Sequence, residues 1–93
     1  MSINEWYKEQ FFNNFELVDL CEFEFPSLEI ANDVAEHLAK EIPNKQFFIL
    51  KSEDYDWYSI DFFDIEEYEN LNECQYLIDR ICRIYHCKLA KKL

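Results

Sequence analysis

The sequence contains no glycine and only two prolines among its 93 residues. Turns must therefore rely on Asn, Asp and Pro, and the glycine-built loops that usually shape a catalytic pocket are missing. No Cys-His pair has an identifiable third group to orient it as a nucleophile. No feature of the sequence predicts a pocket. We therefore expect a protein that is not an enzyme and that carries no cofactor.

The four cysteines form no C-x-x-C pair; they are Cys21, Cys74, Cys82 and Cys87. The N-terminal residues carry charges where a signal peptide needs an apolar run. No segment approaches the length of a membrane span. These observations predict a cytoplasmic protein with free thiols and no contact with a membrane.

Basic residues are few: nine Lys and Arg stand against 20 Asp and Glu, giving a formal net charge of −11. Residues 1–79 hold all 20 acids and only four cations, a net −16, whereas residues 80–93 are net +5. The C-terminal cations fit the end of a helix, which its dipole makes favourable for positive charge. The overall charge opposes direct binding to nucleic-acid phosphate and favours a basic protein surface as the partner.

The apolar content is high despite the charge, since 49% of residues are hydrophobic and nine are Phe. This content argues against disorder. A chain of this length fits one domain, residues 1–93, which buries only about 60–65% of its unfolded surface. We expect a monomer.

Hydrophobic spacing divides the chain into alternating helices and strands. Ser2 and Ser27 are natural N-caps. The predicted elements are a helix over Ile3–Asn13, a strand over Glu16–Phe25, a helix over Ser27–Glu41, a strand over Phe47–Leu50, a tight acidic connection over Ser52–Asp56, a strand over Trp57–Phe63 and a helix over Asn72–Tyr85. Residues 86–93 are open to two readings, a continued helix or a short edge strand. The order predicts an α+β fold with a ferredoxin-like split β-α-β layout, an extra N-terminal helix, and an antiparallel sheet with its helices on one face.

The stretch Lys51–Glu69 is the most distinctive part of the chain. Tyr58, Ile60 and Phe62 share one face of its strand at period two and can close a core. The other face would present rings among carboxylates, which resembles the surface of a nucleic acid. We therefore predict a partner-binding surface; the residues assigned to it are Glu53, Asp54, Tyr55, Asp56, Trp57, Asp61, Phe63 and Asp64. Tyr68 would stand nearby. The alternative is that these rings belong to the core or pack against the first helix.

Other uses of these side chains are less well supported. Paired carboxylates act as acid and base only where a pocket separates their pKa values. Asp54, Asp56 and Asp61 are oxygen ligands suited to Ca²⁺ or Mg²⁺, but the spacing of a calcium loop is absent. Cys82 and His86 have an i, i+4 spacing that can chelate Zn²⁺, yet two further ligands are missing. Buried reduced cysteines are the better interpretation, and we expect no metal site.

Two segments resemble the regulator of ribonuclease E activity B family of small acidic ferredoxin-like proteins. The first is Phe23–Ser27 running into the helix with Ala31, Val34 and Leu38. The second is Trp57–Asp61 followed by an acidic run and an amphipathic helix. The likeness covers roughly residues 17–85, and Tyr85–Leu89 stands where the family has a Tyr-Asp-Gly-Trp-like strand. The resemblance implies a protein that regulates a nuclease by binding it.

Small immunity proteins that neutralise secreted nuclease toxins share this size and acidity. The sequence therefore predicts an acidic inhibitor, with an immunity protein that covers the basic active-site cleft of a nuclease-type toxin as the first hypothesis. A ribonuclease regulator acting away from the active site and a phage-type mimic of nucleic acid are the alternatives. We expect the strands Phe47–Leu50 and Trp57–Phe63 to form an antiparallel hairpin. If this hairpin is not the interface, the aromatic stripe of Trp6, Tyr7 and Phe11 is the next candidate.

Overall fold

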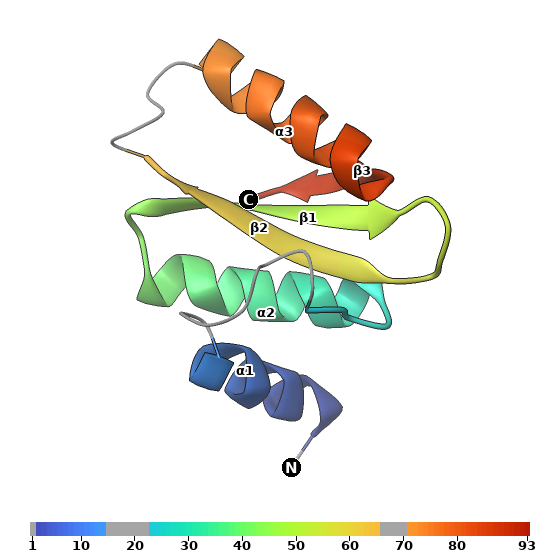
Figure 1. The fold of residues 1–93 in the computed structure, drawn as a ribbon. Coiled ribbons are helices and arrows are strands. Elements are labelled where there is room, and N and C mark those ends of the chain that lie inside the picture. Colours follow the sequence, from blue (N-terminus) through green and yellow to red (C-terminus); the bar gives the residue numbers. More distant parts are fainter. Residues whose placement is uncertain (1, 15–22, 66–70) are drawn as a thin grey trace.

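The computed structural model describes residues 2–14, 23–65 and 71–93 (Figure 1). These residues form three helices and a three-stranded antiparallel sheet. The elements are α1 (Ile3–Asn14), α2 (Leu28–Glu41), β1 (Lys45–Ser52), β2 (Tyr58–Asp64), α3 (Leu71–Tyr85) and β3 (Cys87–Lys92). The predicted α+β class, antiparallel sheet and N-terminal helix are confirmed. In the described ranges, no helix has the length and apolar character needed to cross a membrane.

The helices begin where their capping residues predict. The Ser2 hydroxyl accepts a hydrogen bond from the Glu5 N–H at 3.2 Å at the start of α1. The Ser27 hydroxyl accepts one from the Ile30 N–H at 3.2 Å at the start of α2. Each hydroxyl pairs a backbone donor that the first turn of a helix leaves without an internal partner.

The central strand is β1, which is hydrogen-bonded to β2 on one side and to β3 on the other. In the predicted β1–β2 hairpin, Ile49 lies opposite Ile60. The C-terminal segment, which the sequence left open, is an edge strand whose register on β1 shifts between Ile49 and Leu50. Such a bulge, together with lysines at 88, 91 and 92, is typical of an edge strand protected against further pairing.

The main core lies between the sheet and α2, with α1 packed on the outer side (Figure 1). The strand side chains Tyr58, Ile60 and Phe62 all contact this core, as their spacing predicted. The fully buried side chains in this cluster include Phe11, Phe25, Phe47, Ile49, Val34 and Leu38. The α1–α2 contact is reinforced by Asp33, which accepts hydrogen bonds from Asn4 at 3.0 Å and Lys8 at 3.1 Å.

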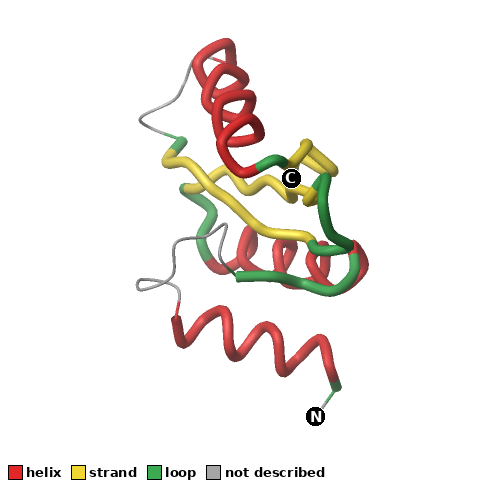
Figure 2. The backbone as a smooth tube through the Cα atoms, turned by 45° about the vertical axis from the view of Figure 1, so that its right-hand side comes forward, coloured by secondary structure: helices red, strands yellow, loops and turns green. Residues whose placement is uncertain are grey.

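The last helix is placed differently from the prediction, because α2 and α3 lie on opposite sides of the sheet (Figures 1 and 2). The reason is visible in β1, where four consecutive residues, Phe47 to Leu50, are buried. Successive strand side chains point to opposite faces, so Phe48 and Leu50 form a second apolar surface away from α2. The amphipathic helix α3, with Ile78 only 4% exposed, lies on that side.

The predicted strand over Glu16–Phe25 is described only from residue 23; the rest of it lies outside the described residues, as does Tyr68. Phe25 forms a single antiparallel bridge with Tyr58. The two backbone hydrogen bonds of this bridge measure 2.7 and 2.8 Å. The bridge places the end of the predicted strand beside β2, on the edge of the sheet opposite β3.

Candidate functional site

The loop between β1 and β2 is held in one shape by its own polar groups. The Ser52 hydroxyl accepts hydrogen bonds from the N–H groups of Asp54 at 3.2 Å and Tyr55 at 3.1 Å. The Lys51 ammonium group donates to the Ser52 and Tyr55 carbonyls, each at 3.3 Å. The Ser52 N–H closes the hairpin on the Trp57 carbonyl at 3.0 Å. These hydrogen bonds fix the loop backbone, so the loop side chains are already positioned before a partner binds.

Two aromatic rings stand on this loop and are open to solvent. Tyr55 is 68% exposed and Trp57 is 44% exposed. Their rings meet edge to face, with centroids 6.4 Å apart and planes at 88°. Edge-to-face contact orients both rings, so each keeps a free surface.

Two backbone contacts bring distant segments to the hairpin. The bridge between Phe25 and Tyr58 holds Glu24 beside one end of β2. The Glu53 N–H donates to the His86 carbonyl at 2.8 Å, which holds the α3–β3 turn against the loop. His86 has φ = 50°, a left-handed conformation that ends α3 without a glycine.

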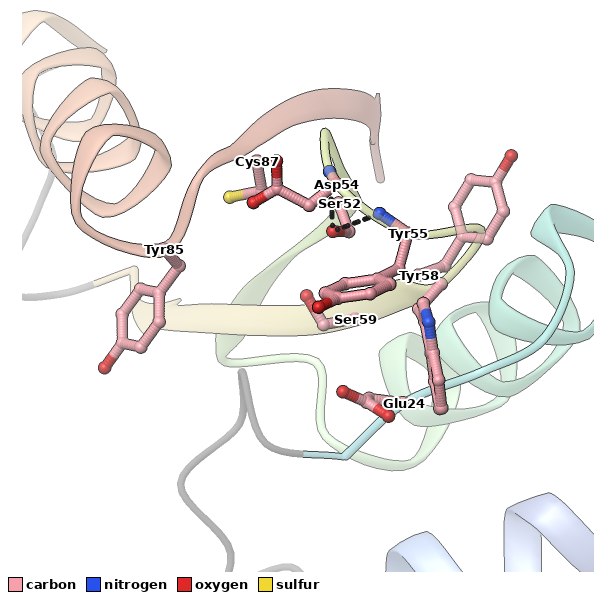
Figure 3. Close-up of a pocket in the computed structure, with 9 residues that line it drawn as sticks. Glu24, Ser52, Asp54, Tyr55, Tyr58, Ser59, Tyr85 and Cys87 are labelled. Atoms are coloured by element: carbon pink, nitrogen blue, oxygen red, sulfur yellow. Dashed lines mark hydrogen bonds between the residues drawn. The ribbon is translucent and has the colours of Figure 1, made fainter.

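The three segments enclose a pocket of about 250 Å³. It has two carboxylates in its lining, and in Figure 3 Glu24 and Asp54 lie well apart, with Ser59 between them. Four aromatic residues also line it: Tyr55, Trp57, Tyr58 and Tyr85. The sequence did not predict this pocket.

The predicted site residues separate into groups. Asp54, Tyr55 and Trp57 line the pocket. Asp56 is fully exposed and forms an ion pair with Lys51 at 3.6 Å. These four loop residues thus stay together at one end of the sheet.

The residues predicted along β2 have other partners. Phe63 packs on Phe48, with ring centroids 5.2 Å apart. Asp64 forms an ion pair with Lys45 at 2.5 Å. Asp64 is seven residues beyond Trp57 on an extended strand, roughly 20 Å away at about 3.3 Å per residue. It belongs to the opposite end of the hairpin.

Glu53 and Asp61 face a pair of thiols instead. Burial, together with the neighbouring Cys82 thiol and these two carboxylates, raises the pKa of Cys87 to about 12. Burial likewise raises the pKa of Cys82, against a hydrogen bond with Cys87 that lowers it. Both thiols are free; the side chains of Cys21 and Cys74 lie outside what the structure describes.

Neither thiol has the lowered pKa of a nucleophilic cysteine. Among the described residues, no three His, Cys, Asp or Glu side chains come together as a metal site. The alternative aromatic stripe of α1 is divided as well. Phe11 is 1% exposed and belongs to the core, whereas Trp6 is 47% exposed.

Sequence reasoning missed Glu24, Tyr58 and Tyr85 as members of the site. Glu24 precedes the fully buried Phe25 in an alternating run, so it was expected on the solvated face. Nothing local indicated which distant segment that face would meet.

Comparisons with protein-family models, with curated proteins and with solved structures found no match. The resemblance to the ribonuclease regulators stays a prediction.

Proposed function

We propose that this protein is an acidic inhibitor that binds a basic protein through the β1–β2 hairpin. The role that fits best is an immunity protein that covers the active-site cleft of a nuclease-type toxin. The observation that carries the proposal is the loop itself, which exposes Tyr55 and Trp57 among the carboxylates of residues 53, 54 and 56. Aromatic anchors within a charged rim are typical of interface hot spots.

The physical rationale is that a nuclease cleft offers what this loop complements. Its Lys and Arg side chains, which normally hold phosphate, would pair with carboxylates, and rings would occupy base positions. The net charge of −11 would attract a basic partner over long range. Such attraction speeds association towards about 10⁸ M⁻¹s⁻¹ at low salt.

The test uses the product of the adjacent gene as the partner, because an immunity gene lies directly beside its toxin gene. We expect this product to be a nuclease that is lethal alone and tolerated when this protein is co-expressed. The double variant Asp54→Lys/Asp56→Lys should lose protection. Its matched control is Glu9→Lys/Glu41→Lys, which makes the same charge change at exposed positions on α1 and α2.

Binding kinetics distinguish the role of the loop carboxylates from the role of Trp57. The hairpin charge reversal should slow association and flatten its salt dependence. Trp57→Ala should instead speed dissociation, with a loss of binding free energy of about 2 kcal/mol or more. Circular dichroism must show that both variants are folded. Wild-type binding by both folded variants would move the interface elsewhere, with exposed Trp6 of α1 as the next candidate.

Enzyme kinetics distinguish the ribonuclease-regulator alternative. An inhibitor that covers the active site competes with nucleic acid and raises KM without changing kcat. A regulator that binds away from the active site changes kcat, and excess substrate does not displace it.

A further inference from the structure

The pocket beside the hairpin has the chemistry of a receptor for a cation. Its rings offer negatively polarised faces, and two of its residues, Glu24 and Asp54, are carboxylates. Within the described ranges, four other acids are paired with lysines: Asp33 with Lys8, Asp64 with Lys45, Asp56 with Lys51 and Glu36 with Lys91. No cation in those ranges pairs with either pocket carboxylate. The pocket thus combines uncompensated negative charge with aromatic walls.

One cation beside the pocket, Lys51, is already held by other groups. The Lys51 ammonium group is bound by two loop carbonyls and Asp56, and it lies 5.5 Å from the centroid of the Tyr58 ring. This contact shows that one ring of the pocket already takes a cation on one of its faces. Because Lys51 is fixed by the loop, a cation for the pocket must come from another molecule.

The size and the polar groups of the pocket indicate which cation fits. A volume of about 250 Å³ is below the roughly 300–1,000 Å³ typical of small-molecule sites, so one side chain fits better than a larger ligand. A guanidinium group has five N–H donors in a plane and stacks on aromatic rings. The pocket offers matching acceptors in its two carboxylates and in the Ser59 hydroxyl. A lysine ammonium group would use fewer of them.

We propose that this pocket receives a single arginine side chain of the partner protein. The proposal rests on the proposed function, since it names the group of the basic partner that the hairpin would capture. The guanidinium group pairs with Asp54 and stacks on Tyr55 or Trp57. The hairpin then recognises a particular arginine and not only positive charge.

The experiment needs no partner. N-acetyl-arginine amide is titrated into ¹⁵N-labelled protein, and the backbone and Trp57 indole N–H signals are followed. We expect saturable shifts confined to residues around the pocket. The neutral analogue N-acetyl-citrulline amide, which has nearly the same shape, should bind at least tenfold more weakly, and N-acetyl-lysine amide should bind more weakly than the arginine probe.

Two pairs of variants supply the matched controls. Asp54→Asn should weaken binding of the arginine amide about tenfold, whereas Glu41→Gln, an exposed acid on α2 outside the pocket lining, should leave it unchanged. Trp57→Phe should keep more of the affinity than Trp57→Leu, because it keeps a ring. Equal effects of Asp54→Asn and Glu41→Gln would show general attraction to an acidic surface and would overturn the proposal, as would tighter binding of citrulline or lysine.

The two proposals can fail separately. If the arginine amide binds as described but the adjacent gene product is no nuclease, the pocket stands and the proposed function falls. If the nuclease is inhibited through the hairpin but no arginine probe enters the pocket, the arginine site alone is wrong.

Discussion

The two faces of the sheet are covered in different ways. On the α2 face, ten buried residues among those described form one continuous core to which α1, α2 and both hairpin strands contribute. On the α3 face, four of the side chains that the structure describes are buried, and they lie outside that cluster: Phe48, Leu50, Ile78 and Cys87. The helix α3 itself leaves Tyr76 61% exposed and Ile84 59% exposed.

This difference indicates that one face of the sheet mainly stabilises the fold and the other mainly positions the binding site. A dense core resists rearrangement, because interiors packed like crystals have few empty spaces into which side chains can move. The thinner α3 face brings the α3–β3 turn to the hairpin and so completes the pocket. We infer that the α2 face fixes the fold, while the α3 face positions the site and can adjust when a partner binds.

Two neighbouring phenylalanines test most directly whether the two faces of the sheet are packed differently. Phe47 and Phe48 are each 1% exposed and lie on opposite faces of β1. Phe47→Ala should cost about 4–5 kcal/mol of unfolding free energy, and Phe48→Ala nearer 3 kcal/mol, because the α3 side can close part of the cavity. Urea unfolding of both variants measures the difference.

The slope of free energy against urea concentration serves as the control for that pair. An unchanged slope shows that each variant still unfolds from an equally compact state. Equal losses in the two variants, or a larger loss for Phe48→Ala, would mean that the α3 face is as rigidly packed as the α2 face.

Alkaline pH should lower the unfolding free energy of the protein through a buried thiol on the α3 face. Burial raises the pKa of Cys87 from 9.0 to about 12. Below pH 9 both the folded and unfolded states keep the proton. Above pH 9 the unfolded state releases it first, so unfolding becomes easier until the folded thiol also ionises near pH 12. The loss is at most about 4 kcal/mol, since one pKa unit corresponds to about 1.4 kcal/mol.

The measurement compares unfolding free energies of wild type and Cys87→Ala at pH 8 and pH 10.5. The variant lacks the titrating thiol, so its free energy should fall less over this interval, although it is less stable at both pH values. A decline as steep as that of wild type would show that the buried thiol does not cause the pH dependence.

Local features of the sequence predicted the α2 side well. The cap at Ser27 and the alternation of Tyr58, Ile60 and Phe62 depend on neighbours in the chain, and the structure has both. The side of the sheet that α3 covers depends on contacts between distant segments, which its apolar stripe does not specify. The pocket was missed for the same reason. It is assembled by the Phe25–Tyr58 bridge and by one backbone hydrogen bond to His86.

The smallest expected effect has the opposite sign and concerns the end of α3. His86 has φ = 50°, where a side chain costs about 1–2 kcal/mol relative to glycine. Glycine also has more freedom to lose on folding, so His86→Gly should stabilise the protein by about 0.5–1 kcal/mol net. Thermal unfolding should detect a rise of a few degrees.

His86→Ala is the control, because it removes the imidazole but keeps the Cβ atom that causes the cost. If alanine stabilises as much as glycine, the gain comes from losing the imidazole and the backbone conformation is not the cause. The hydrogen bond from Glu53 uses the backbone carbonyl, so His86→Gly keeps that contact. A glycine variant that is more stable yet binds the arginine probe more weakly would show that the stiff turn contributes to the site, because the added freedom would loosen Tyr85 and Cys87 at the pocket.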